Sequence, residues 1–142
     1  MDLNNKLYKK FETISHSADL RFKVFGDDLK DIFQNAVLLL ALTSVVELPL
    51  KLNIKKELTI DALDKESLLV DFLNEILTKM QVNKAVYPEA QIISLNENKI
   101  SAVIFGAPIN RFKEEVKAVT YYRVKIKKNK EGLFETDLLF DI

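Results

Sequence analysis

The segment from residue 48 to residue 63 alternates apolar and polar side chains, and this pattern constrains the fold more than any other stretch. In its sequence, LPLKLNIKKELTIDAL, leucine and isoleucine fill most of one set of alternate positions, and polar residues fill most of the other. Successive side chains of a strand point to opposite faces, so the pattern predicts a long strand with one solvated face. Such half-exposed strands are typical of antiparallel sheets, because parallel sheets are usually covered on both faces.

Two other segments repeat their apolar residues at helical spacing. One helix is expected to begin after Asp28 and to end near Thr43 and Ser44, and a second is expected to begin after Asp64. An aspartate just before a helix accepts hydrogen bonds from the free N–H groups of the first turn. The second helix has an apolar face that reaches Met80, and five polar residues are expected to face outward, namely Asp71, Asn74, Glu75, Thr78 and Lys79.

The other predicted elements are strands. They are expected at 6–14, at 20–26, in a hairpin over 90–106 that turns at 96–98, and at 114–128 and 132–142, which flank a turn at 129–131; residues 106–114 are expected to form a loop. The resulting order, β-β-α-β-α-β-β-β-β, predicts an α+β fold. We expect a single compact domain over residues 1–142, in which a largely antiparallel sheet packs on two helices.

Composition excludes several classes of protein. The 142 residues include 21 lysines and arginines and 21 aspartates and glutamates, and a net charge of zero argues against binding nucleic acid mainly by neutralising phosphates. The longest apolar run, residues 36–46, is too short to span a bilayer. The N-terminus lacks the apolar core of a signal peptide. These features predict a cytoplasmic protein without a membrane partner.

Several common sites are missing from the sequence. It contains neither GxxxxGK[ST] nor GxGxxG, and with no cysteine and one histidine it cannot form a Cys/His zinc cluster. A triad built from Ser15 or Ser17 with His16 and Asp19 is disfavoured, because residues adjacent on one turn rarely reach the geometry that a triad needs.

The predicted last hairpin brings two charged residues together. Its turn is centred near residue 129 or 130, and antiparallel partners mirror one another across the turn. Lys117 is therefore expected opposite Asp141 or very near it, with both side chains on one face. Alternation continues through Ile142, so we expect its α-carboxylate to be held beside Asp141. The group is either a surface salt bridge, which contributes at most about 1 kcal/mol, or part of a site.

The segment HSADL, residues 16–20, contains the only histidine, His16, and an aspartate, Asp19. If this segment folds over the same end of the sheet, three carboxylates converge there, and like charges at that distance require a cation. Oxygen ligands suit Ca²⁺, Mg²⁺ or Mn²⁺ better than zinc. Pattern alone leaves two interpretations of Asp19 open, a capping turn or a ligand. His16 either bonds to the backbone of its turn or orients the segment.

Four stretches together resemble the archease family, over a range from Tyr8 to Ile142. HSADL with the following Gly-Asp-Asp-Leu is similar to the family's His-Thr-Ala-Asp-Val segment and helix entry. SLLVDFLNEIL at 67–77 resembles its second helix, and EVKAVTYY at 115–122 resembles its Glu-Val-Lys-Ala-[Ile/Val]-Thr-Tyr motif. The closing Asp-Ile matches the family's last two residues.

The resemblance implies an accessory protein and not an enzyme. Archease proteins promote the guanylylation and multiple turnover of RtcB-type RNA ligases in tRNA splicing or RNA repair, so the implied partner is such a ligase, and RNA is contacted only through it. By similarity, Asp19, Lys117 and Asp141 are essential for activation. A metal site formed by Asp19, Asp141 and Ile142 is also implied, with His16 supporting it. Ca²⁺ is the expected ion, and Mg²⁺ and Mn²⁺ are alternatives.

Three departures from the family pattern leave the acidic residues and the lysine intact but argue against a functional role for loop 106–114. Ser17 replaces a threonine, Gly106 is followed by Ala107 and not by glutamate, and Tyr122 occupies a position where relatives often have histidine. Two other functions stay open. One is a chaperone-like scaffold, and the other is an RNA-binding module in which exposed aromatic side chains stack on bases. The candidates for stacking are Phe112, Tyr121 and Tyr122.

Overall fold

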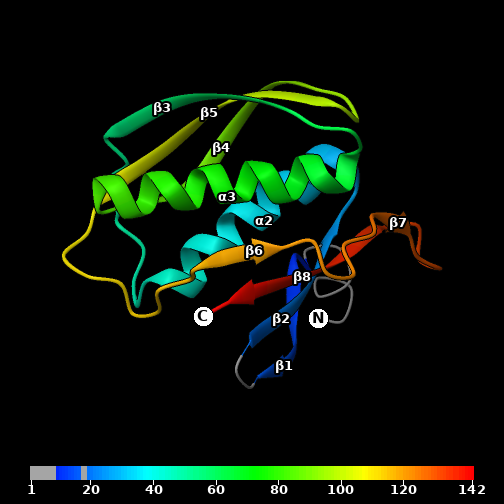
Figure 1. The fold of residues 1–142 in the computed structure, drawn as a ribbon, viewed down its shortest axis with the longest axis horizontal. Coiled ribbons are helices and arrows are strands. Elements are labelled where there is room, and N and C mark those ends of the chain that lie inside the picture. Colours follow the sequence, from blue (N-terminus) through cyan, green and yellow to red (C-terminus); the bar gives the residue numbers. More distant parts are fainter. Residues whose placement is uncertain (1–8, 17–18) are drawn as a thin grey trace.

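The chain forms two antiparallel sheets with two helices between them (Figure 1). The structure is a computed structural model that describes residues 9–16 and 19–142. Within that part of the chain, one sheet has five strands, in the order β1-β2-β8-β6 with β7 paired to β8, and the other has three, in the order β3-β5-β4. The predicted α+β class is confirmed, and the antiparallel strands are divided between two sheets.

The helices and strands occur in the predicted order. The five-stranded sheet contains β1 (Phe11–His16), β2 (Asp19–Gly26), β6 (Ala118–Thr120), β7 (Lys127–Lys128) and β8 (Phe134–Asp141). The three-stranded sheet contains β3 (Ile54–Asp61), β4 (Ala85–Leu95) and β5 (Lys99–Pro108), and the helices are α2 (Leu29–Ser44) and α3 (Lys65–Asn83). The hairpin turn at 96–98 is confirmed. Residues 6–8 of the predicted first strand lie outside the described residues.

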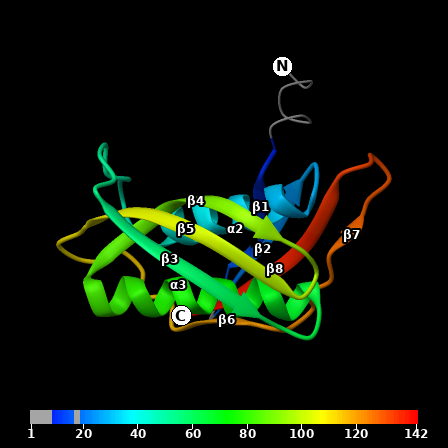
Figure 2. The same ribbon diagram turned by 90° about the horizontal axis from the view of Figure 1, so that it is seen from above.

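Both helices begin at the predicted aspartate. The Asp28 carboxylate accepts a hydrogen bond from the Asp31 backbone N–H at 2.9 Å, and Asp64 accepts one from Ser67 at 2.7 Å. Helix α2 contacts β2 and β4, and α3 contacts β4 and β6, so the helices form the middle layer (Figure 2). None of the helices in the described part of the chain is long and apolar enough to cross a membrane.

The predicted strand at 48–63 is wrong over its first half. Strand β3 begins at Ile54, which pairs with Gly106 of β5, and Leu50 is fully exposed. Pro49 has no N–H to donate to a ladder, and neither does Pro108, which lies just beyond the Gly106 pair. The alternation of apolar and polar residues therefore begins before Ile54, in residues that have no partner strand among the described residues.

The predicted strand at 114–128 is also interrupted. Only β6 and β7 are strands, and the residues between them form a connection in which Arg123 has a φ of 57°. A left-handed backbone of this kind bends the chain out of a ladder. The next strand, β8, is confirmed, and so is its alternation, because Thr136, Leu138 and Phe140 are buried.

Candidate functional site

Strands β2 and β8 bring Asp19 and Asp141 side by side at one end of the five-stranded sheet. Asp19 is the cross-strand partner of Asp141, and on its other side Asp141 pairs with Ala118 of β6. Figure 1 shows the C-terminus between β6 and the end of β2. Asp19 thus lies at the sheet end beside Asp141, as the hypothesis of converging carboxylates requires.

The two carboxylates lie on the solvated face of the sheet. In β2 the alternate residues Leu20, Phe22 and Val24 are buried, so Asp19 belongs to the opposite face. Asp19 is half-buried and Asp141 is exposed. Within the described residues, no lysine or arginine forms an ion pair with either. Like charges directly opposite each other destabilise a sheet, so this pair reduces stability.

Ile142 directly follows the last residue of β8 and continues the predicted alternation. Its side chain packs against the hydrophobic core as a partly buried residue, on the face that carries Phe140. This packing holds the end of the strand in place, with the backbone of Ile142 directly after Asp141. Carboxylate oxygens from Asp19, Asp141 and Ile142 are hard donors that suit a divalent cation such as Ca²⁺.

Lys117 lies very near Asp141, as predicted, although the two residues are not cross-strand partners. Its backbone N–H donates to the Asp141 carbonyl oxygen at 2.7 Å, although the cross-strand partner of Asp141 is Ala118. Two consecutive residues thus face one residue on β8, which is the arrangement of a β-bulge. The Lys117 side chain is exposed, and among residues 9–16 and 19–142 no ion pair joins it to Asp141. The simple salt bridge is therefore not observed.

His16 is the last residue of β1, and its backbone pairs with Leu20. Its side chain lies outside what the structure describes, as does Ser17, so the predicted supporting role of His16 stays a prediction. Within the described residues, no three His, Cys, Asp or Glu side chains are grouped closely enough to hold a metal ion. The metal site expected from Asp19, Asp141 and Ile142 therefore stays a prediction.

The aromatic side chains proposed to stack on bases have other contacts. The Tyr122 ring is 5.9 Å from the Arg21 guanidinium carbon and 5.1 Å from that of Arg123. Tyr121 donates its hydroxyl proton to Asp71, and this hydrogen bond raises the pKa of Tyr121. Both tyrosines are more than half exposed, whereas Phe112 packs against the core. The tyrosines are thus held by polar and cation–π contacts on the surface.

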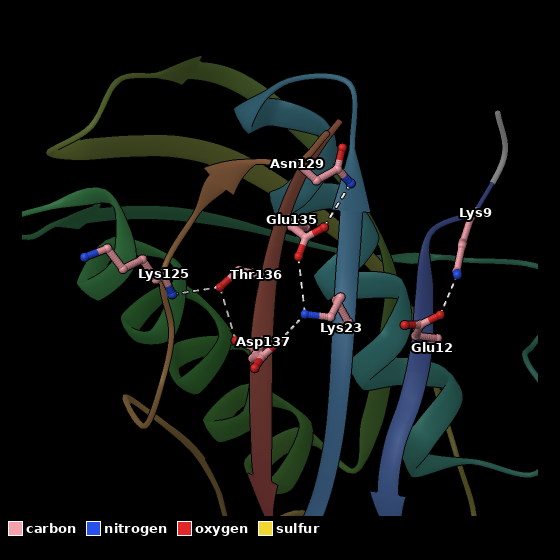
Figure 3. A network of polar contacts seen from close by, with 8 residues as sticks. All are labelled: Lys9, Glu12, Lys23, Lys125, Asn129, Glu135, Thr136 and Asp137. Atoms are coloured by element: carbon pink, nitrogen blue, oxygen red, sulfur yellow. Dashed lines mark hydrogen bonds and ion pairs between the residues drawn. The ribbon is translucent and has the colours of Figure 1, made fainter. Parts of the chain in front are cut away.

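Toward the other end of the same strand pair, one lysine is paired with two carboxylates, as drawn in Figure 3. The Lys23 ammonium lies 2.8 Å from Asp137 Oδ1 and 3.3 Å from Glu135 Oε2. The hydrogen bond to Asp137 raises the pKa of Lys23, and Glu135 adds to the effect. Asn129 donates to Glu135 at 2.9 Å, so each of the two carboxylates has a donor from a neighbouring segment.

The sequence did not predict the hydrogen bonds that Asn74 and Gln81 make to the segment next to Lys117. The Asn74 amide exchanges two hydrogen bonds with the Val119 backbone, and Gln81 donates to the Val116 carbonyl. The prediction that Asn74 faces outward is wrong, because its side of α3 faces residues 116–126.

Gly106 allows two strands to pack closely, since a Cβ there would lie 2.2 Å from the Val86 carbonyl oxygen.

Known proteins match this chain over nearly its whole length. Residues 11–142 match the model of the Archease protein family (MTH1598/TM1083). "Protein archease" of Methanosarcina acetivorans is 30% identical, with 94% of this chain and 97% of the relative covered. "Protein archease" of Pyrococcus abyssi is 32% identical, with 94% and 99% covered.

Solved structures share the fold. The solution structure of Methanobacterium thermoautotrophicum protein 1598 superposes with a TM-score of 0.71 at 25% identity, and 94% of this chain and 99% of that one are covered. The crystal structure of an archease, described as a possible chaperone, from Thermotoga maritima gives a TM-score of 0.67 at 19% identity, with 92% and 96% covered. From the match to the family model and the identity to its members, the chain belongs to the archease family.

Proposed function

We propose that this chain is a non-enzymatic activator of an RtcB-type RNA ligase, which promotes guanylylation and multiple turnover of the ligase in tRNA splicing or RNA repair. The observation that carries the proposal is the direct pairing of Asp19 with Asp141 on neighbouring strands, with Lys117 bonded to the same residue. Membership of the archease family supports it. In this proposal the protein acts in the cytoplasm and meets RNA only through the ligase.

Asp19, Asp141 and the α-carboxylate of Ile142 would hold the divalent cation, with Ca²⁺ expected and Mg²⁺ or Mn²⁺ as alternatives. The two aspartates come from adjacent strands and have no cationic partner among the described residues, so they are available as ligands. When bound, the cation would supply positive charge that offsets the carboxylates and attracts phosphate oxygens. His16, the last residue of β1, would orient the segment that carries Asp19.

Lys117 would supply a positive charge at the same sheet end. Its side chain is exposed, while its backbone is anchored to Asp141. An ammonium group in this position is free to contact an anionic group in the ligase active site, such as a nucleotide phosphate. The exposed sheet end would therefore dock at the ligase active site, where Asp19, Asp141 and Lys117 act together.

A ligation assay with a cognate ligase tests the proposal. The wild-type chain should increase multiple-turnover ligation, and Asp19→Ala, Asp141→Ala or Lys117→Ala should reduce the rate to that of the ligase alone. Asp137→Ala is a matched control, because Asp137 lies on β8 and on the same face as Asp141 but is paired with Lys23. Full stimulation by all three site variants would refute the assignment. We expect the three variants still to bind the ligase but no longer to stimulate it. If they bind and also stimulate it, the protein acts as a scaffold.

A further inference from the structure

One side of α3 is lined with polar side chains that hold the segment 116–126 along the helix. Asp71 accepts from the Tyr121 hydroxyl, and Glu66 accepts from the Ile126 backbone N–H at 3.0 Å. Asn74 and Gln81 bond to the backbone nearer Lys117. The helix and the segment run antiparallel, and Figure 1 shows β6 alongside α3. By contrast, Glu75 and Lys79 pair with each other at the surface.

Asn74 takes the place of a missing neighbouring strand. Its amide nitrogen donates to the Val119 carbonyl at 2.8 Å, and its amide oxygen accepts from the Val119 N–H at 2.8 Å. β6 has only β8 as a partner strand within the described residues, so Val119 would otherwise have an unpaired N–H and C=O on its outer side. A side-chain amide has one donor group and one acceptor, as a backbone peptide unit does, so it can satisfy both.

Gln81 lies two helical turns further along α3 and completes the attachment. Its amide donates to the Val116 carbonyl at 3.2 Å. The two attached residues, Val116 and Val119, bracket Lys117, whose own N–H donates to the Asp141 carbonyl oxygen. Lys117 is therefore held from the helix on both sides and from β8 by its own amide.

Hydrophobic burial does not by itself produce this placement. Val116 and Val119 are each 2% exposed, so their burial anchors the segment to the core. Burial is not directional, however, and does not select one register of the segment against β8. The hydrogen bonds from Asn74 and Gln81 are directional, and they set which residue faces Asp141.

We propose that Asn74 and Gln81 are positioning residues that hold Lys117 at the Asp19–Asp141 pair. This inference rests on the proposed function, in which Lys117 contacts an anionic group of the ligase. α3 is thus a part of the activating site, although neither amide reaches the sheet end itself. Loss of either amide should leave the fold intact and free Lys117 to move.

Amide hydrogen exchange of the full chain, read by NMR at Lys117, tests the positioning directly. Asn74→Ala and Gln81→Ala should each speed exchange of the Lys117 amide by roughly tenfold or more, because each removes an attachment of the segment. Gln34→Ala is the matched control. Gln34 on α2 donates to the Ala90 carbonyl at 3.2 Å, the same bond length as Gln81 to Val116, but far from Lys117 along the chain. Unchanged exchange in both site variants would overturn the inference.

Stimulation of the cognate ligase tests what the positioning does. Asn74→Ala and Gln81→Ala should lower the maximal stimulation severalfold while the concentration for half-maximal stimulation stays the same, since the docking surface is intact. Gln34→Ala should change neither. Equal losses in all three variants would show that stability alone is responsible and would overturn the inference.

A further variant separates this inference from the proposed function. If Lys117→Ala stimulates as well as the wild type, the proposed role of Lys117 fails, and amide exchange alone decides whether α3 holds the residue. If Lys117→Ala is inactive while Asn74→Ala speeds exchange at Lys117 and stimulates fully, the proposed function stands and the positioning role is refuted.

Discussion

The two ends of the β2–β8 strand pair differ in whether their carboxylates are paired with a cation. At one end Glu135 and Asp137 share the ammonium group of Lys23, at 3.3 and 2.8 Å. At the other end Asp19 and Asp141 face each other directly, and no cation pairs with either among the described residues. The strands and the sheet face are the same, so the backbone does not cause the difference.

This contrast separates a structural cluster from a candidate site. Two carboxylates on one strand can be accommodated if a lysine on the neighbouring strand pairs with both, as Lys23 demonstrates. The Asp19–Asp141 pair lacks that solution and carries an electrostatic cost. A pair kept at a cost to stability is expected where function requires it. Changes of charge should therefore affect activity at the Asp19–Asp141 end and stability at the Lys23 end.

Giving the unpaired end a cation should abolish activity. Asp19→Lys would place an ammonium group opposite Asp141 and so reproduce the Lys23 arrangement. We expect ligation in the presence of this variant to fall to the rate of the ligase alone, while the free energy of unfolding stays the same or rises by up to about 1 kcal/mol. Multiple-turnover ligation and urea unfolding measure the two effects. If the Asp19→Lys variant stimulates ligation as well as the wild type, the assignment of function to the unpaired Asp19–Asp141 end is wrong.

A divalent cation should stabilise the wild type but not the Asp19→Lys variant. A ligand that binds only the folded state adds about 2.7 kcal/mol at a free concentration of one hundred times Kd. Thermal unfolding with Ca²⁺, Mg²⁺ or Mn²⁺, compared with a chelator, measures the shift in each protein. Equal shifts in both proteins would place the ion away from Asp19.

Removing the cation from the paired end should reduce stability and leave activity intact. Lys23→Met leaves Glu135 and Asp137 close together without their shared ammonium group. We expect a loss of about 1 kcal/mol in the free energy of unfolding, measured with urea, and unchanged stimulation of the ligase. Loss of stimulation by a well-folded Lys23→Met protein would show that this end also belongs to the site.

High pH should remove the same stabilisation gradually. The hydrogen bond to Asp137 raises the pKa of Lys23 above its ordinary value of 10.5. Because the folded-state pKa is the higher one, the pair's contribution is complete below pH 10.5 and is lost as the pH rises through the folded-state pKa. The difference in unfolding free energy between wild type and Lys23→Met should thus be constant near neutral pH and shrink above pH 10.5. A difference that grows there would contradict the assigned direction.

The local elements of the fold could be predicted from sequence. Asp28 and Asp64 cap their helices as expected, because the cap and the first turn are separated by three residues. The predicted last hairpin also placed Lys117 near Asp141, and this proximity is kept although the first strand of the hairpin is interrupted between β6 and β7. The prediction left open whether Lys117 lies opposite Asp141 or very near it, because no local pattern in the sequence encodes the bulge that decides this.

The convergence at the site could not be predicted in the same way. Asp19 meets Asp141 only because β2 pairs with β8, a contact between distant parts of the chain that no local pattern encodes. Alternation at 48–53 looked like a strand, but no partner strand is there among the described residues. On α3, a polar residue that faces solvent and one that bonds to a passing backbone have the same helical spacing, so Asn74 could not be distinguished from Glu75.

The pairing of β2 with β8 also has a consequence for how the molecule folds. Contacts between residues far apart in sequence form at a higher entropic cost than local ones, and they tend to slow folding. The capped helices and the β4–β5 hairpin can form before β8 joins its sheet. The two aspartates, by contrast, meet only when β8 has paired with β2. The carboxylate pair should therefore be absent from partly folded chains, and any property that depends on it would report on the completed native state.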